Sequence, residues 1–210
     1  MTVSTSAVAI CNKALDLLGQ KGEVTNIETP RTEQEIIFAR HYDDTRQMVL
    51  RKYVWNFATE RKRINRDPLN SPDFDYTDAY KLPNDFIRLL SFDDYQSLCE
   101  VEYELSGGYL LLNNNGAASI RLRYIKDVTD VHKFDPGFKY LFSLYLAAAV
   151  AYKFSQKQTV LQRIYELIGV EEAKIISIDG QERPPRRVQR SKYLNARKRL
   201  GSSNSASPWI

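Results

Sequence analysis

Cysteine and histidine are scarce in this sequence of 210 residues, which contains two of each. Cys11 and Cys99 lack the paired spacing of a zinc site, and two cysteines are too few for a disulfide framework. His41 and His132 each lack a second ligand three or four residues away, as a helical metal site would require. We therefore expect no metal, no disulfide scaffold and a reducing compartment.

Long hydrophobic runs are also missing. The longest, around residues 141–152, lies between Lys139 and Lys153, which are separated by 13 residues. A membrane-spanning helix needs about 20 apolar residues. Near the N-terminus, no basic residue precedes the apolar stretch, as a secretory signal would require. We expect a soluble protein without a membrane segment.

Motifs of catalysis and cofactor binding are equally few. The segment Ser106-Gly107-Gly108 lacks the Lys-Ser/Thr pair of a phosphate-binding P-loop. The acidic clusters at residues 73–78 and 93–94 do not have the spacing of a calcium loop. A Cys-His nucleophilic pair would need side chains that the pattern places on different elements. The sequence predicts no catalytic residue, no cofactor and no enzymatic activity.

What the chain does contain is an ordinary globular composition with an uneven charge. Hydrophobic residues make up 43% and charged residues 27% of the chain. Residues 181–200 contain eight basic residues and one acidic residue, whereas the rest of the chain contains 22 basic and 25 acidic residues. A mildly acidic body with a strongly basic C-terminal segment indicates that this segment interacts with a partner.

Two segments before residue 60 have helical periodicity. The first covers residues 6–18, and Gly19 can provide a left-handed C-terminal cap. The second begins at Thr32, whose hydroxyl group can form a capping box with Glu35. Its apolar positions continue at helical spacing as far as Phe57. We therefore predict two successive amphipathic helices.

The helical pattern returns at Asp135-Pro136, a cap followed by proline at the first helical position. This third helix runs to about residue 154 and is apolar almost all round, so every side must be covered. Neighbouring subunits or the other helices of the same subunit can provide this cover, and the sequence leaves both alternatives open. A fourth helix begins at Thr159.

Between the second and third helices the hydrophobic pattern has a period of two residues. Strands are indicated at 86–95, 101–105, 109–112 and 119–126, with turns at Ser106-Gly107-Gly108 and at 113–116. We expect an antiparallel meander of three or four strands. Glutamates of the strand at 101–105 are expected to pair with arginines of the strand at 119–126.

These elements together predict an α+β, mainly α fold: an antiparallel four-helix bundle interrupted by a small antiparallel β-sheet insertion, with an extended C-terminal tail. Residues 1–72 would form the first half of the bundle, 73–131 the sheet insertion and 132–179 the second half. Residues 180–210 would be a flexible basic tail, because they cannot bury enough apolar surface.

Three interpretations of the basic tail remain open. Arginine and tryptophan side chains could anchor it in a groove of another protein. Its cations could instead bind the phosphates of a nucleic acid. The third interpretation is a solvated segment that only increases solubility.

Several short motifs follow one another in an informative order. They are Tyr42-Asp43-Asp44-Thr45-Arg46, Val49-Leu50-Arg51, Trp55-Asn56-Phe57-Ala58, Ala79-Tyr80, Leu82-Pro83, Arg88-Leu89, Tyr124-Ile125, Val128-Thr129-Asp130 and Phe134-Asp135-Pro136. Their order and spacing over residues 7–175 resemble the tail tubular protein A family, the head-to-tail adaptors of short-tailed bacteriophages. The arginine-rich tail and its SPWI ending depart from the family pattern.

The resemblance implies a virion structural protein, made in the host bacterial cytoplasm and located at the head–tail junction. Its subunits would form a dodecameric ring between the portal protein and the tail nozzle protein. DNA would pass through the ring without sequence-specific binding, and no membrane would be involved. The alternative function is a small nucleic-acid-binding protein that uses the basic C-terminal tail.

On this hypothesis two groups of residues contact partners. The subunit interface is expected to include Asp43, Asp44, Arg46, Arg51, Ala147, Ala148 and Ala151. The portal-binding residues are expected to be Arg183, Arg186, Arg187, Arg190, Lys192, Tyr193, Arg197, Lys198, Arg199 and Trp209.

Overall fold

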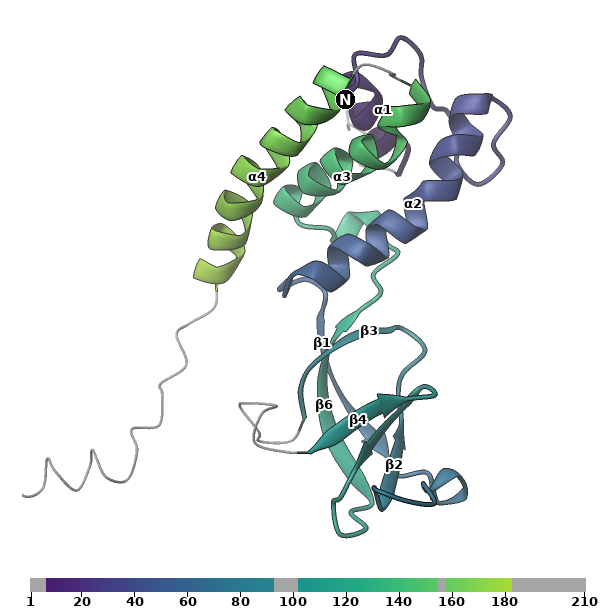
Figure 1. Cartoon of the computed structure of the whole chain (residues 1–210), viewed down its shortest axis with the longest axis vertical. Coiled ribbons are helices and arrows are strands. Elements are labelled where there is room, and N and C mark those ends of the chain that lie inside the picture. Colours follow the sequence, from purple (N-terminus) through teal and green to yellow (C-terminus); the bar gives the residue numbers. More distant parts are fainter. Residues whose placement is uncertain (1–6, 93–101, 155–157, 183–210) are drawn as a thin grey trace, which may run out of the picture. The chain divides into compact units, whose positions relative to one another are not determined.

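The computed structural model describes residues 7–92, 102–154 and 158–182. The chain divides into two units, Met1–Asp179 and Gly180–Ile210, and the first contains nearly all of the described elements. Within the described residues, the helices are α1 (Ala7–Leu17), α2 (Glu33–Lys52), α3 (Pro136–Phe154) and α4 (Gln158–Gln181). The strands are β1 (Thr59–Asn65), β2 (Asp78–Lys81), β3 (Phe86–Phe92), β4 (Tyr103–Ser106), β5 (Tyr109–Leu112) and β6 (Ser119–Lys126). Figure 1 shows the helices gathered together and the strands gathered together.

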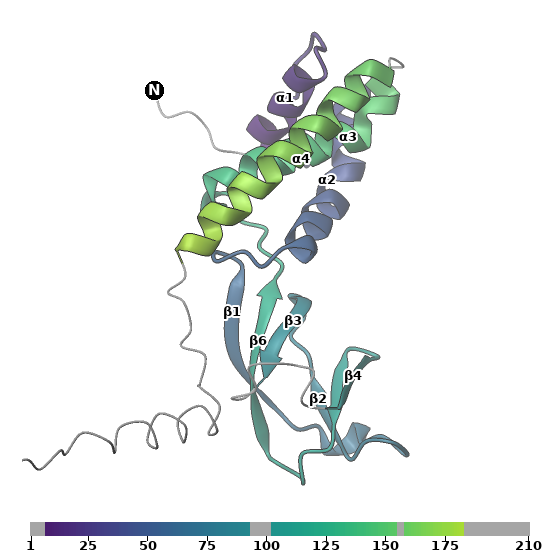
Figure 2. The same cartoon turned by 60° about the vertical axis from the view of Figure 1, so that its left-hand side comes forward.

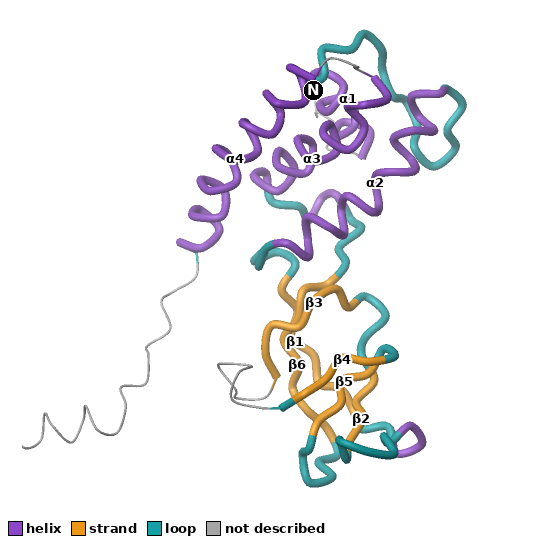
Figure 3. Tube along the Cα trace, viewed as in Figure 1, coloured by secondary structure: helices purple, strands orange, loops and turns teal. Residues whose placement is uncertain are grey.

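The strands form two three-stranded antiparallel sheets with non-sequential order, β1-β6-β3 and β2-β5-β4. They enclose a hydrophobic core of their own, which includes Tyr80, Phe92, Leu110, Leu122 and Tyr124. The predicted four-helix bundle with a small sheet insertion is therefore wrong: the chain is a mixture of helices and two sheets. All the described strands, shown in orange in Figure 3, lie between α2 and α3 in the sequence.

Strand β1 is the main reason why the predicted four-helix bundle with a small sheet insertion is wrong. It lies at Thr59–Asn65, in the segment assigned to the helical half, and Ile64 is its only strongly apolar residue. Its partner is β6, more than 50 residues away, so the pairing gives no local signal. A sequential meander is excluded for the same reason, because the central strand of this sheet is the last of the six described strands.

Helix α2 ends earlier than its apolar pattern predicts. The capping box at its start is confirmed, since Thr32 accepts a hydrogen bond from the Glu35 backbone N–H and Glu35 bonds back to the cap. At the other end, the Trp55 indole donates to the carbonyl oxygen of Val49 at 3.0 Å. This bond satisfies one of the free carbonyl groups at the helix terminus. The chain therefore turns after Lys52, and Phe57 lies beyond the helix.

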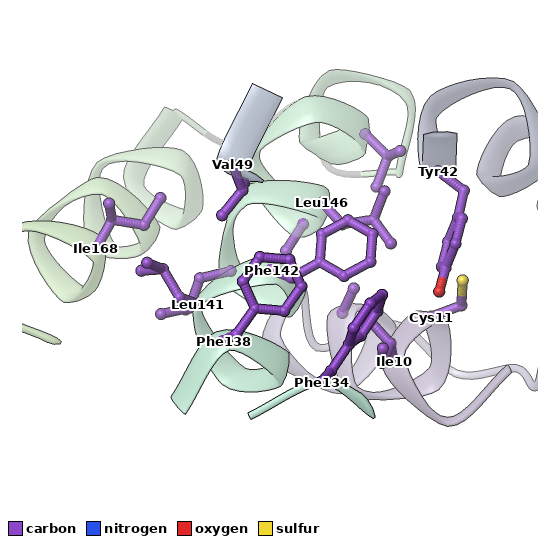
Figure 4. Packing of buried hydrophobic residues seen from close by; sticks show 14 of the residues in the cluster. Ile10, Cys11, Tyr42, Val49, Phe134, Phe138, Leu141, Phe142, Leu146 and Ile168 are labelled. Atoms are coloured by element: carbon purple, nitrogen blue, oxygen red, sulfur yellow. The ribbon is translucent and has the colours of Figure 1, made fainter. Parts of the chain in front are cut away.

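The helical core is rich in aromatic side chains (Figure 4). Phe138 lies at its centre, fully buried, with ring centroids 4.8 Å from Phe134, 5.0 Å from Phe57, 5.1 Å from Trp55 and 5.8 Å from Phe142. Three of these four pairs have the edge-to-face geometry that aromatic rings prefer. Rings from two other parts of the chain, residues 55–57 and Phe134, thus pack against α3.

The loop between α1 and α2 is fixed by the carboxylate of Glu35. This side chain is 2% exposed and accepts five hydrogen bonds. The backbone N–H groups of Arg31 and Thr32 donate at 2.7 and 3.0 Å, and Thr25 donates from both its N–H and its hydroxyl group. The Arg31 and Thr32 bonds are the main reason that the pKa of Glu35 lies well below its usual range.

Substitution Glu35→Gln should make stability less dependent on pH. A lowered folded-state pKa stabilises the protein above the unfolded pKa of about 4.3, and this contribution is lost as the pH falls below it. We expect the wild-type chain to lose thermal stability progressively below about pH 5 and the variant to lose less. At pH 7 the variant should melt lower by on the order of 5 °C. Scanning calorimetry between pH 3 and 7 measures both effects.

The matched control is Glu33→Gln, an exposed glutamate in the same helical turn. It should melt within a few degrees of the wild type and keep the wild-type pH profile. Equal pH profiles for Glu35→Gln and the wild type would contradict the assignment of this contribution to Glu35.

Candidate subunit interface

Helix α4 buries only part of its apolar surface. Ile164, Ile168 and Ile175 are buried against the helical core. Tyr165, Val170 and Ile178 are 57%, 55% and 61% exposed. Figures 1 and 2 show α4 along the outside of the helical group. A helix with large apolar side chains beyond its buried stripe offers a surface to another molecule.

Polar contacts hold α4 against the end of α2. The Lys52 ammonium lies 2.8 Å from the Glu172 carboxylate and also contacts the Tyr145 hydroxyl. Burial lowers the pKa of Lys52, but Glu172 and Tyr145 raise it more, so the ammonium group stays charged. The position of α4 is therefore fixed by charge as well as by packing.

The C-terminal half of α4 makes two further close contacts. The Asn56 backbone N–H donates to Asp179 Oδ1 at 3.0 Å, and its side chain donates to the Asp179 carbonyl oxygen at 2.6 Å. At Gly137, a Cβ atom would lie 2.8 Å from Ile175 Cγ2 and 2.9 Å from Asp135 Oδ1. Glycine is therefore required at position 137 for α4 to approach α3 this closely.

A groove of about 330 Å³ lies between the end of α1 and the start of α4. Its apolar lining includes Leu17, Val160 and Leu167, and Asp16 and Arg163 are its charged residues. Three of the apolar lining residues, Val160, Ile164 and Leu167, come from α4, so the groove adds to the apolar surface that this helix leaves uncovered. Together, the groove and the exposed residues Val170 and Ile178 form what we call the α4 surface.

A second, polar hollow surrounds Glu35 and is lined by Thr25, Asn26, Thr29, Arg31 and Thr32. Its carboxylate already accepts five hydrogen bonds from the surrounding loop. A ligand would have to displace these bonds, so we assign the hollow to loop structure.

The predicted interface residues on α2 have different environments. Asp43 is 70% exposed and Asp44 is exposed, but Arg46 is only 5% exposed. The Arg46 guanidinium contacts Asp43, and its Nε lies 3.1 Å from Oδ1 of Asp127. Asp127 directly follows the last residue of β6. Arg51 donates to the carbonyl oxygen of Ile87 at 2.7 Å. Arg46 and Arg51 therefore join the helices to the strands within one subunit.

The predicted alanine interface on α3 requires a correction. Ala147 and Ala151 are 0% and 1% exposed, while Ala148 is half-buried. The helices of the same subunit cover Ala147 and Ala151, so these two residues cannot reach a neighbour without unfolding of the core. Of the two explanations for the all-round apolar helix, the structure favours cover within one subunit.

The predicted portal-binding residues lie outside the described residues. They are Arg183, Arg186, Arg187, Arg190, Lys192, Tyr193, Arg197, Lys198, Arg199 and Trp209. The α4 surface was not among the predicted sites. Its signal in the sequence is the number of large apolar residues on α4, which exceeds what one helical face can bury.

The sequence predicted neither a membrane segment nor a metal site, and the described residues bear on both predictions. In residues 7–92, 102–154 and 158–182, no helix combines the length and apolar character needed to cross a membrane. The same ranges contain no group of three or more His, Cys, Asp or Glu side chains arranged to hold a metal ion.

Burial raises the pKa of the Cys11 thiol to about 12, so this thiol stays protonated at neutral pH.

No family model matches this chain, and no curated protein matches it. The functional assignment therefore depends on the residues, the resemblance of its motifs and the α4 surface.

Proposed function

We propose that this chain is a non-enzymatic structural protein of a short-tailed bacteriophage, located in the virion. It forms a ring, dodecameric as in the family it resembles, between the portal protein and the tail nozzle protein. DNA passes through this ring without sequence-specific binding. The observation that carries the proposal is the uncovered apolar α4 surface, taken with the ordered motifs over residues 7–175.

A ring needs a surface that contacts a different surface of the next subunit. The α4 surface supports this geometry because its apolar residues and groove are presented on a helix that packing, one ion pair and hydrogen bonds hold in place. Asp43 and Asp44, both exposed, remain proposed contacts of the neighbouring subunit.

The basic tail is proposed to bind the portal protein. Eight cations within 20 residues, followed by Trp209, supply the arginine and tryptophan side chains that anchor protein–protein contacts. One such contact is weak, but many copies on one symmetric surface bind together through their effective concentration. The proposal explains how the ring could form on the portal at low protein concentration.

The test replaces Arg183, Arg186, Arg187 and Arg190 with glutamine in the full chain. We expect binding to purified portal protein to weaken by at least about 100-fold, because several charge-assisted contacts are lost in every copy. Sedimentation of the chain with portal particles measures the binding. The control replaces four exposed lysines, Lys21, Lys62, Lys81 and Lys133, and so removes the same net charge. Normal portal binding by the arginine variant would refute the role of the tail.

A further inference from the structure

One exposed row of side chains on α2 is charged in its middle and apolar at both ends. Its members follow one another at intervals of four residues: Ile36, Arg40, Asp44 and Met48. Residues at this spacing form a ridge along a helix, here about 18 Å long. Ile36 and Met48 are 36% and 45% exposed, and the two charged residues are exposed as well. We call these four residues the α2 row.

The α2 row faces away from the core of its own chain. Phe38 and Tyr42, each two positions after a residue of the row, lie about 200° around the helix from it. Their rings contact Phe154 and Phe142 of α3, with centroids 5.6 and 5.0 Å apart. Figure 1 shows α2 and α4 on different sides of α3. The row is therefore accessible to a neighbouring copy and does not meet the groove of its own chain.

The charges of the row have no partner in the structure. Arg40 precedes Asp44 by four residues, and at this spacing the order with the base first is the weaker one. Within residues 7–92, 102–154 and 158–182, neither side chain forms an ion pair. The row thus presents one free guanidinium group and one free carboxylate between two apolar side chains.

The groove of the α4 surface has the same combination. Its charged residues are Asp16, from the end of α1, and Arg163, from α4. Lys13, one helical turn before Asp16, lies over the ring of Tyr140, 4.4 Å from the centroid. In the part of the chain that the structure describes, neither charged residue of the groove forms an ion pair. One carboxylate and one guanidinium group therefore border an apolar lining.

We propose that the α2 row of one copy docks on the α4 surface of the next copy. Arg40 pairs with Asp16 of the neighbouring copy and Asp44 with Arg163, while the apolar ends of the row cover the apolar residues of the α4 surface. This inference rests on the proposed ring and names the second surface that a ring contact requires. A purely acidic or purely basic partner would match only one of the two charges on each surface.

The test exchanges the charges of one pair in the full chain. Asp16→Arg and Arg40→Asp each place like charges at the contact, so each variant should assemble at least about tenfold more weakly than the wild type. Asp16→Arg/Arg40→Asp restores opposite charges between copies and should return to within about threefold of the wild type. Sedimentation velocity measures association of the free chain, and electron microscopy measures rings on portal particles.

The matched control is Asp16→Arg/Lys62→Asp, which has the same net charge as the exchange variant. Lys62 is an exposed residue of β1, outside both surfaces, so this control should assemble as weakly as Asp16→Arg. Equal assembly of the control and the exchange variant would overturn the proposal, and so would normal assembly of both single variants. Loss of portal binding by Arg40→Asp with unchanged self-association would assign the row to the portal and overturn it too.

The contact and the adaptor function fail separately in these measurements. Rings that form on portal particles regardless of the four charges overturn the contact alone. Self-association that follows the charge exchange, with the portal particles left bare, overturns the adaptor function alone. A chain that never associates, free or with portal, overturns both.

Discussion

Replacing Phe138 with alanine should lower the free energy of unfolding by about 4 kcal/mol. The side chain is fully buried and contacts the rings of Trp55, Phe57, Phe134 and Phe142. Its removal leaves a cavity that these rings cannot fill without losing their own contacts. For a chain of this size, the unfolding midpoint should fall by roughly 10 °C. Urea denaturation followed by circular dichroism measures the change.

Tyr152→Ala is the control because it removes an aromatic ring from the same helix. Tyr152 is 81% exposed, so its loss should change the free energy of unfolding by less than about 0.5 kcal/mol. A large decrease in the free energy of unfolding for Tyr152→Ala and a small decrease for Phe138→Ala would contradict the description of α3.

Charges on the α4 surface should prevent ring formation. Val170→Glu/Ile178→Glu places carboxylates on two residues that are 55% and 61% exposed in the single subunit, so the fold should be preserved. In a ring these carboxylates would be buried without a partner, which is costly. We expect at least a 100-fold loss of ring formation on portal particles, with unchanged circular dichroism and unfolding midpoint. Negative-stain electron microscopy and analytical ultracentrifugation measure assembly.

The control for this experiment is Leu69→Glu/Phe74→Glu. These side chains are 93% and 77% exposed in the loop between β1 and β2, away from α4 in the sequence. This variant tests whether two carboxylates on any exposed apolar residues are enough to block assembly. We expect it to form rings like the wild type. If the α4 variant forms rings like the wild type, α4 is not part of the interface.

Local signals in the sequence predicted local structure well. The capping box of Thr32 and Glu35 is present. The turn at Ser106-Gly107-Gly108 is also present: both glycines have positive φ, +57° and +83°, as a tight hairpin turn requires. In each case the residues that determine the structure are neighbours in the chain.

Pairings between distant segments could not be predicted. The glutamates of the 101–105 segment were expected opposite Arg121 and Arg123, but Glu104 pairs with Leu111, and the two arginines face Arg61 and Arg63. Strand order depends on which apolar faces meet in the shared core. Neither the register of β1 nor the like-charge pairs that it creates can be read from alternation within a single strand.

The candidate interface likewise depends on contacts between distant segments, which the sequence did not reveal. The arginines on α2 were expected between subunits because charged side chains on an amphipathic helix usually face outward. Arg46 instead has a carboxylate partner at Asp127, 81 residues further along the chain. The exposed apolar residues of α4 could be recognised only after the structure showed which face of this helix meets the core.

The most direct test of the proposed function is cryo-electron microscopy of the purified full chain mixed with its proposed partner, a bacteriophage portal protein. We predict a closed ring of copies of this chain seated on the portal, with α4 at the contact between adjacent copies. A chain that stays monomeric in every mixture, with the portal particles bare, would contradict the account.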